Sequence, residues 1–557
     1  MTRLSRAAIL AIFFWNVNSS FTAPGRAPKL GDISAFFHRS TMAMAASRGH
    51  GVHVIRSLTA ASGSPRPSTR QAWLRLSGSS NCWQACFSSG QSASASASAT
   101  SVSSPAAGSS PAGTSQPSSI EVNGRTFTTD SWFNAPANVL ASTARQLHLQ
   151  KDHPICITRQ ILESVYPRPT FKSHNTFHPV VSTHENFDSL GFPPDHPGRN
   201  RSDTYYINKN TLLRTHTSAH QASLFRASES DGYLISADVY RRDEVDRTHY
   251  PVFHQMEGAR VWDRKKVPNG DIVAAVYADL ERLPKHNVKV EDPNPPFHAE
   301  RNPLQSEHHS PAEAEAVATH LKRSLELMVV EIFSRAKAAA AKADPDYVDE
   351  PLRVRWVEAY FPFTSPSWEL EIYYQGDWLE VLGSGVTKQD LFTNAGVPSQ
   401  LGWAFGIGLD RIAMLLFQIP DIRLFWSTDE RFLNQFTGVS DNLDSLKRFV
   451  PFSKYPACYK DVSFWLRSTS AAGGNTKASV QDWHENDLME VVRNIAGHDV
   501  EDVKLVDEFS HPKTGRRSMC YRINYRSLER TLTNSETNQL HSEVTKALVN
   551  KLGVEIR

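Results

Sequence analysis

Residues 238–258 read DVYRRDEVDRTHYPVFHQMEG, and no other stretch constrains the fold as much. Two of its segments, DVYRRD and YPVFHQME, have the apolar and aromatic content of β-strands. Because side chains alternate along a strand, Arg241 falls on one face of the first segment, and Gln255 and Glu257 share a face of the second. Buried charges are costly without partners. The hairpin therefore predicts a ligand that offers negative charge to an arginine and an amine to a glutamate.

The N-terminal segment, residues 1–118, differs in composition from the rest of the chain. It holds ten Lys and Arg against one acid, Asp32, and it includes the repeat SASASASA. Such a composition cannot bury a core, and it is typical of a targeting leader. Removing it from the totals leaves 50 basic and 57 acidic residues, a net charge of −7. Contact with nucleic acid would therefore need a local basic patch.

The leader predicts an organellar destination. Its apolar run AAILAIFFW is too short to span a bilayer. A second acid-free stretch follows Met42 and is typical of mitochondrial presequences. We expect the mitochondrial matrix, with the plastid as an additional destination, and no membrane association.

Residues 119–448 predict an α+β domain. Ser310, Pro311 and Glu313 mark the start of a long helix through a capping box and a proline at the first helical position. Shorter helices are expected over residues 138–150 and 153–166, and a surface loop over residues 284–303. Alternating strands follow in LRVRWVEAYF, WELEIYYQG and DWLEVLGSG. The pattern is that of a mainly antiparallel sheet flanked by helices.

Residues 449–557 predict a separate domain, because the pattern restarts there. ACYKDVSFWL, VEDVKLVDEF, SMCYRINYRS and GVEIR read as strands, and ENDLMEVVRNIAG reads as a helix. Thr533 and Glu536 form a second capping box before a last helix. The order βαββαβ is that of a ferredoxin-like module.

A glycine-rich stretch, GWAFGIGLDRIAMLL at residues 402–416, adds a second cationic site. Its glycines permit close backbone approach, and Arg411 falls in the first turn of a helix, where anions bind well. By itself this is also the pattern of a tight strand–helix turn. Combined with Arg241, it favours a phosphate-binding site.

Six motifs in order carry a resemblance to a known family: FDSLGFPPDHPGR, HTSAHQ, VYRRD, FHQMEG, YFPF and GWAFGIGLDR. The chain resembles the class II aminoacyl-tRNA synthetases, and among them phenylalanyl-tRNA synthetases of the single-chain organellar type, from about residue 120 to the C-terminus. The resemblance implies the class II antiparallel sheet, ATP and Mg²⁺ as cofactors, and L-phenylalanine and tRNA(Phe) as partners of a monomer. It also implies a phenylalanyl-adenylate intermediate.

The resemblance implies a role for each motif residue. Arg241 and Arg411 are catalytic and bind the α- and γ-phosphates of ATP. The phenylalanine-binding set is His216, Thr217, Ser218, Ala219, His220, Gln221, Gln255, Glu257, Phe361, Phe363, Ala404 and Phe405. The remaining ATP-binding residues are His249, Glu380 and Gly408. No residue is assigned as a direct metal ligand. Asp410 and Asp243 stand where the family usually has Glu.

The C-terminal module resembles the anticodon-binding domain of the same enzymes. Its basic residues cluster between Lys513 and Arg530, where Glu529 is the sole acid. Residues expected to bind tRNA are Lys513, Arg516, Arg517, Tyr521, Arg522 and Arg526, with Tyr521 and Tyr525 stacking on bases. A solvated basic strand is the alternative. We expect removal of the module to abolish tRNA charging and to spare adenylate formation.

Two alternatives remain open. One is an enzyme of this fold that charges another amino acid, against which YFPF and FHQMEG argue. The other is a catalytically inactive tRNA-binding relative, against which Arg241, Glu257 and Arg411 argue.

Overall fold

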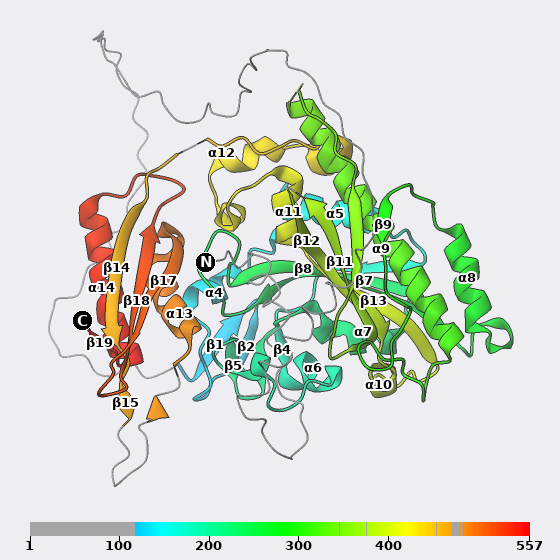
Figure 1. The fold of residues 1–557 in the computed structure, drawn as a ribbon, viewed down its shortest axis with the longest axis horizontal. Coiled ribbons are helices and arrows are strands. Elements are labelled where there is room, and N and C mark those ends of the chain that lie inside the picture. The colour runs from blue at the N-terminus through cyan, green and yellow to red at the C-terminus, as the bar shows by residue number, and fades with distance from the viewer. Residues whose placement is uncertain (1–116, 345, 375, 453, 470–478, 481–482) are drawn as a thin grey trace, which may run out of the picture. The chain divides into compact units, whose positions relative to one another are not determined.

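The computed structural model describes residues 117–557 apart from 345, 375, 453, 470–478 and 481–482 (Figure 1). The predicted targeting leader lies outside the described residues except for its last two positions. Within the described part, no helix is long and apolar enough to cross a membrane.

An eight-stranded sheet forms the centre of the first domain, in the order β3-β7-β8-β13-β12-β11-β10-β9. Its strands are β3 Phe171–His174, β7 Gly232–Tyr240, β8 Val252–Asp263, β9 Lys289–Glu291, β10 Arg353–Glu358, β11 Thr364–Tyr374, β12 Asp377–Thr387 and β13 Gln400–Gly408. The six inner strands pair antiparallel, and the two edge strands pair parallel to their neighbours. The predicted antiparallel sheet is confirmed.

Three helices cover one face of this sheet. They are α5 Pro154–Ser164, α9 Pro311–Ala343 and α11 Leu409–Phe417, and α8 Ile272–Arg282 lies beside α9 (Figure 1). The capping box of Ser310 and Glu313 is present at the start of α9. Trp403 donates to His320 and Trp356 to Glu326, both on α9, so the indoles fix the helix to the sheet as well as filling the core.

The other face of the sheet is bordered by short elements. They include the three-stranded sheet of β4 Val180–Ser182, β5 Tyr206–Asn208 and β6 Thr211–Leu213, the 3-10 turn η4 Thr217–His220, and the helices α6 Thr183–Asn186, α7 Gln221–Ala227 and α10 Gln389–Asn394. The hairpin of β1 Ser119–Val122 and β2 Arg125–Thr128 precedes these elements in the chain, and α12 Glu430–Leu433 follows them. These elements lie around the edges of that face, and side chains of the sheet itself line its middle.

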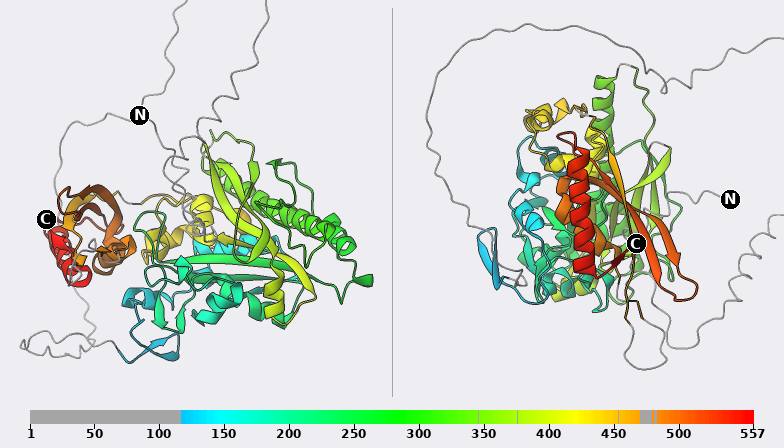
Figure 2. Two further views of the ribbon diagram at one scale, coloured as in Figure 1. Left: turned by 60° about the horizontal axis from the view of Figure 1, so that its bottom comes forward. Right: turned by 90° about the vertical axis from the view of Figure 1, so that its left-hand side faces the viewer.

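The C-terminal domain has the predicted βαββαβ order. Its elements are β14 Cys458–Trp465, α13 Glu485–Ala496, β17 Val500–Ser510, β18 Arg517–Tyr525, α14 Asn534–Leu552 and β19 Glu555–Ile556, with a small pair β15 Ser468–Thr469 and β16 Ser479–Val480. The sheet order is β17-β18-β14-β19. Both helices pack on one face of it and share its apolar core, and Figure 2 shows α14 running along the strands. The capping box of Thr533 and Glu536 is present.

Two local expectations were wrong. The helix expected over residues 138–150 is α4 Ala137–Ser142 followed by the 3-10 turn η1 Leu147–Leu149. Gln146, with φ of 42°, lies between them in the left-handed region, which a continuous helix cannot include. The expected loop at residues 284–303 contains the edge strand β9.

The loop between β7 and β8 contacts the C-terminal domain. Arg493 of α13 donates to the carbonyl oxygens of Asp243, at 2.5 Å, and Glu244, at 3.0 Å. Val245 is buried within the apolar core of the C-terminal domain. Arg423 donates to three carbonyl oxygens of that domain at 2.8–2.9 Å. The hairpin that holds Arg241 is therefore supported by residues of both domains.

Candidate active site

The uncovered face of the central sheet has a floor of small residues. Glu257 on β8 lies opposite Gly406 on β13, which lies opposite Gly383 on β12. Small residues repeat at neighbouring positions of the same face, which are Ala259, Ala404, Gly385 and Gly408. The missing side chains let other groups approach the sheet closely: Phe361 lies over Gly383, Pro366 and Thr364 lie over Gly385, and the position over Gly408 is open.

Glu257 lies within a ring of uncharged donors. It is 3% exposed, and its Oε1 accepts hydrogen bonds of 3.2 Å from Gln221 Nε2 and from Tyr233 Oη. Its Oε2 accepts from Ser218 and, at 3.5 Å, from Thr217. Burial raises the pKa of Glu257 to about 7 against the opposing effect of these hydrogen bonds. A carboxylate with polar neighbours but no cation suits a positively charged ligand.

Gln255 joins this group, as the sequence predicted. Its Oε1 accepts from the backbone N–H of Thr217 at 3.2 Å. Its amide nitrogen lies 3.3 Å from the point where a Cβ at Gly406 would stand. A side chain at Gly406 would press on the amide.

Aromatic rings form a wall of the space above the floor. The rings of Phe361 and Phe363 are parallel, with centroids 6.0 Å apart and planes at 10°. Phe361 rests on Gly383, where an added Cβ would lie 2.6 Å from the ring. Phe192, which sequence reasoning missed, lies 6.3 Å from Phe363 and stacks on His216 at 5.7 Å and 7°. Its motif was recognised, but its position opposite YFPF is set by tertiary packing.

His216 is a neutral imidazole in this setting. It is 8% exposed, and burial, with a smaller effect from Arg241, lowers its pKa to about 3. Both ring nitrogens are buried without a hydrogen-bond partner. Unpaired buried nitrogens of this kind favour a polar ligand group nearby.

The two arginines are held by different elements. Arg241 follows the last residue of β7, and its Nε donates to the Thr215 carbonyl oxygen at 2.7 Å. Arg411 lies in the first turn of α11, directly after the glycine-rich strand β13. The preceding residue, Asp410, accepts from the backbone N–H of His254 at 2.5 Å. This bond attaches the start of α11 to β8 and fixes Arg411 relative to Gln255.

Three glutamates on β11 and β12 lie on the same face as the floor. Glu371 stands opposite Glu380, and Glu369 stands opposite Gly383. Burial, with the charges of Glu380 and Glu371, raises the pKa of Glu369 to about 7. Burial also raises the pKa of Glu380, which nearby Arg411 opposes. Glu371 forms an ion pair with Arg355 of β10, and Arg411 is the cation that acts on Glu380.

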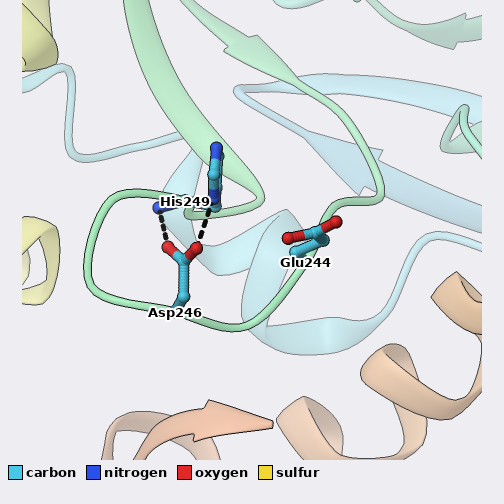
Figure 3. A group of neighbouring side chains, drawn as sticks. All are labelled: Glu244, Asp246 and His249. Atoms are coloured by element: carbon cyan, nitrogen blue, oxygen red, sulfur yellow. Dashed lines mark hydrogen bonds and ion pairs between the residues drawn. The ribbon is translucent and has the colours of Figure 1, made fainter. Parts of the chain in front are cut away.

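The loop between β7 and β8 contains an ion pair between Asp246 and His249. The Asp246 carboxylate accepts from His249 Nδ1 at 2.7 Å and from the backbone N–H of His249 at 2.8 Å (Figure 3). It also accepts from the backbone N–H of Thr248 at 2.6 Å. Burial lowers the pKa of His249, but Asp246 and the neighbouring charges of Asp243 and Glu244 raise it on balance. Glu244, Asp246 and His249 bring their ligand atoms within 4.8 Å of one another.

Three residues of the predicted phenylalanine set are placed elsewhere by the structure. Phe405 lies on the opposite face of β13 from Ala404, because strand side chains alternate, and packs in the core against Tyr166. Ala219 packs with Val181 and neighbouring apolar residues. His220 bonds to Arg214. The contacts described for these three side chains are to other residues of the domain.

The predicted tRNA-binding set also needs correction. Tyr521 is fully buried and its ring stacks on Phe464, and Tyr525 is buried as well, so neither ring can stack on bases. The helices α13 and α14 cover that face of the sheet. Arg516, Arg517, Arg522 and Arg526 form ion pairs with acids of the domain, and Lys513 is exposed.

Other rings occupy the uncovered face of the C-terminal sheet. Tyr459 is 61% exposed and Phe509 is 39% exposed. Trp465 lies 6.1 Å from Phe509. The guanidinium groups of Arg516 and Arg557 lie 5.2 Å and 5.7 Å from the Trp465 ring. Sequence alternation along β14 separates Tyr459 and Trp465 from the core residues Val462 and Phe464, but only the packing shows which set is exposed.

Comparison with known proteins agrees with this geometry. Residues 136–301 and 315–436 match the core domain of class II tRNA synthetases (F), and residues 453–557 match the ferredoxin-fold anticodon-binding domain. The mitochondrial phenylalanine–tRNA ligase of Saccharomyces cerevisiae is 50% identical over 459 residues, which cover 79% of this chain and 95% of the yeast protein.

Two further relatives extend the comparison. The mitochondrial enzyme of Mus musculus is 42% identical, over 79% of this chain and 89% of its own length. The chloroplastic/mitochondrial phenylalanine–tRNA ligase of Arabidopsis thaliana is 40% identical, over 76% of this chain and 82% of its own length.

The fold is that of a class II aminoacyl-tRNA synthetase. Its C-terminal domain adds the module that such enzymes use to bind the anticodon. At this level of identity, the chain belongs to the phenylalanine–tRNA ligases of the organellar type. Members of this class use ATP, typically with a divalent metal, and join an amino acid to tRNA.

Proposed function

We propose that the chain activates L-phenylalanine with ATP on the uncovered face of the central sheet, and then transfers it from the adenylate to tRNA(Phe). The observation that carries this proposal is the placement of Glu257. Its buried carboxylate stands among uncharged donors, beside a floor of glycine and alanine and within reach of an aromatic wall. An amino group and an aromatic side chain fit this arrangement.

Phenylalanine is bound by two sets of residues. Glu257 and Gln255 receive the ammonium group, with Thr217, Ser218 and Gln221 holding the glutamate. Phe361 and Phe363 hold the ring, and Ala404 lies at its far end. His216 contributes an imidazole that burial keeps uncharged. The floor and wall together determine which side chain fits.

ATP is bound by cationic side chains of the β7–β8 hairpin and of the first turn of α11. Arg241 contacts the α-phosphate, Arg411 the γ-phosphate, and His249 reaches the phosphates from the hairpin loop. Gly408, whose Cβ position is open, lets the nucleotide approach the backbone. Glu380, beside Arg411, would help to hold Mg²⁺, which supplies charge neutralisation when bound.

The chemistry needs no protein nucleophile. The phenylalanine carboxylate attacks the α-phosphorus, a new P–O bond forms, and pyrophosphate leaves. Arg241 and Arg411 stabilise the charge that develops, so catalysis rests on orientation and electrostatics. The terminal ribose hydroxyl of the tRNA then attacks the adenylate carbonyl, and AMP leaves.

We further propose that tRNA binds the uncovered face of the C-terminal sheet. Tyr459, Trp465 and Phe509 offer rings for base stacking, and Lys513, Arg516 and Arg522 offer charge for the phosphates. Arg517, at the start of β18, alternates onto the face of Met519 and Tyr521 and is left out of this set. Exposed ion pairs are weak, so the arginines can exchange their acidic partners for phosphates. Arg526 is engaged with the buried Glu501 and supports the fold of the domain.

The proposal includes domain boundaries at residues 118 and 448 and a monomeric state. It also includes two destinations, the mitochondrial matrix and the plastid. The relatives support an organellar address, mitochondrial in yeast and mouse and chloroplastic/mitochondrial in Arabidopsis. Fusion of residues 1–118, and separately 42–118, to a fluorescent reporter tests mitochondrial and plastid import. Cytosolic fluorescence from both fusions contradicts it. Light scattering of the purified chain tests the monomer.

Amino-acid-dependent exchange of pyrophosphate into ATP tests the function directly, with residues 119–557 and a panel of amino acids. We expect exchange with phenylalanine, and about 100-fold weaker exchange with tyrosine, because an apolar pocket rejects an added hydroxyl only by about this factor. Exchange with another amino acid alone would indicate a different synthetase. Folded protein without exchange would indicate a binding-only relative.

A further inference from the structure

Tyr233 contacts the amine-binding carboxylate but has no part in the reaction described above. It lies on β7, opposite Ala259, which places it diagonally beside Glu257 on the same face of the sheet. The side chain is 5% exposed, and its hydroxyl donates to Glu257 Oε1 at 3.2 Å. Phe225 packs against its ring at 5.5 Å. The packing of the ring and the hydrogen bond together fix the hydroxyl beside Glu257.

The charge of Glu257 is balanced by hydrogen bonds alone. Besides Tyr233 from β7, the groups facing it are Thr217 and Ser218 from η4 and Gln221 from α7. Gly406, its partner on β13, has no side chain. Among the described residues that shift the pKa of Glu257, none is a cation. Each hydrogen-bond donor therefore contributes to keeping the carboxylate ionised.

The titratable groups nearby do not supply that charge. Burial lowers the pKa of His216 and of His220 to about 3, so both are neutral near pH 7. Arg214 pairs with Asp238, and Arg241 bonds to the Thr215 carbonyl oxygen.

We propose that Tyr233 is a positioning residue for phenylalanine binding: its hydroxyl keeps Glu257 ionised and oriented toward the substrate ammonium group. This rests on the proposed function, in which Glu257 receives the amine. Without the hydroxyl, Oε1 keeps only the Gln221 hydrogen bond, and the charged form of the carboxylate loses stabilisation. A protonated carboxyl does not attract the ammonium group. Tyr233 thus sets the lowest pH at which phenylalanine binds well.

The test compares the pH dependence of kcat/KM for phenylalanine between the wild-type chain and Tyr233→Phe, by pyrophosphate exchange at saturating ATP. In the wild type, kcat/KM falls below about pH 7 as Glu257 takes up a proton. In the variant, we expect this limb to move up by about one pH unit. At pH 7 that is a loss of about fivefold, and at pH 8.5 a loss of less than about twofold.

Tyr206→Phe is the matched control. Tyr206 is also buried and donates one hydrogen bond, at 2.7 Å to the Arg199 carbonyl oxygen, but it lies on β5 away from Glu257. In this variant, the fall of kcat/KM at low pH should occur at the same pH as in the wild type. Equilibrium binding of phenylalanine, followed by tryptophan fluorescence, should repeat the shift, and binding of 3-phenylpropionate, which lacks the ammonium group, should not show it.

The outcomes separate this inference from the proposed function. The role of Tyr233 is overturned if kcat/KM of Tyr233→Phe falls at the same pH as in the wild type, or if the loss of kcat/KM is the same at every pH. Glu257→Gln should abolish the limb and weaken phenylalanine binding in both assays. If Glu257→Gln binds phenylalanine like the wild type, the amine site itself has been misplaced, whatever Tyr233→Phe does.

Discussion

Arg241 is the side chain for which geometry and charge give the clearest expectation at the scale of single residues. Its guanidinium is fixed by the Thr215 carbonyl oxygen and lies 5.5 Å from the Phe253 ring, so it is oriented before the substrates arrive. Arg241→Ala should cost about 3 kcal/mol of transition-state stabilisation, or about 100-fold in kcat/KM for pyrophosphate exchange. Arg282→Ala, on the surface of α8, is the control. Near-normal exchange by Arg241→Ala contradicts its role.

Asp246 and His249 give a pH-dependent prediction. Because the pKa of His249 is raised, its imidazolium persists above pH 6.5. Asp246→Asn removes the main cause of that rise, so the imidazole loses its charge near neutral pH and binds phosphate less well. We expect the KM for ATP to increase about fivefold at pH 7.5, where one ionic contact of about 1 kcal/mol is lost, and to stay near that of the wild type at pH 5.5.

The measurement is the KM for ATP across this pH range. A KM that does not change at pH 7.5 would show that His249 does not bind ATP in the charged form. A KM that rises equally at both pH values would show that the loop itself has been disturbed.

At the scale of elements, strand β12 supports the aromatic wall through a missing side chain. In Gly383→Ala, the new methyl group would lie 2.6 Å from the Phe361 ring and displace it. We expect the KM for phenylalanine to rise about tenfold, since overpacking costs roughly 1–3 kcal/mol. The KM for ATP, measured in the same assay, is the internal control. A shift of both constants would indicate a general distortion of β12.

Local signals along the chain predicted element boundaries well. The capping boxes at Ser310 and Thr533 are present as expected, because their hydrogen bonds join residues three apart in sequence. Strand alternation also correctly predicted that Gln255 and Glu257, two residues apart on β8, lie on one face of the hairpin.

Tertiary packing decided what alternation alone could not. Alternation separates Tyr521 from Arg522, but the face that α13 and α14 cover is set by the fold of the whole domain. Phe405 is different, because alternation along β13 is enough to place it on the opposite face from Ala404. Phe192 and Tyr233 reach the site from distant parts of the chain, so the order of residues carried no sign of their proximity to Phe363 and Glu257.

At the scale of the whole molecule, we expect a substitution of Trp465 to affect tRNA charging and not adenylate formation. Trp465→Ala should lower tRNA charging about tenfold, because stacking on an aromatic ring is worth about 1–3 kcal/mol per base. Pyrophosphate exchange should remain unchanged, since adenylate formation does not need tRNA. Trp465→Phe keeps a ring and should recover much of the charging rate. Equal loss of exchange and charging would show that Trp465 supports folding alone.

Contacts of the hairpin loop revise the expectation for the truncated chain. Val245 is buried among residues of the C-terminal domain, and Arg493 holds the carbonyl oxygens of Asp243 and Glu244. Removal of residues 449–557 should therefore lower pyrophosphate exchange as well as abolish tRNA charging. Both rates, measured on protein whose circular dichroism shows a folded catalytic domain, test this. Undiminished exchange would mean that the loop keeps its structure without these contacts.

The floor of small residues also limits how the substrate range of such a site can evolve. Gly383, Gly385 and Gly406 have no side-chain atoms to lose, so every substitution there removes room and none creates it. Acceptance of a larger amino acid must come from positions that have atoms to give up, such as Ala404 and the phenylalanines of the wall. Substitutions that broaden the substrate range are therefore expected at those side chains, whereas substitutions anywhere on the floor can narrow it.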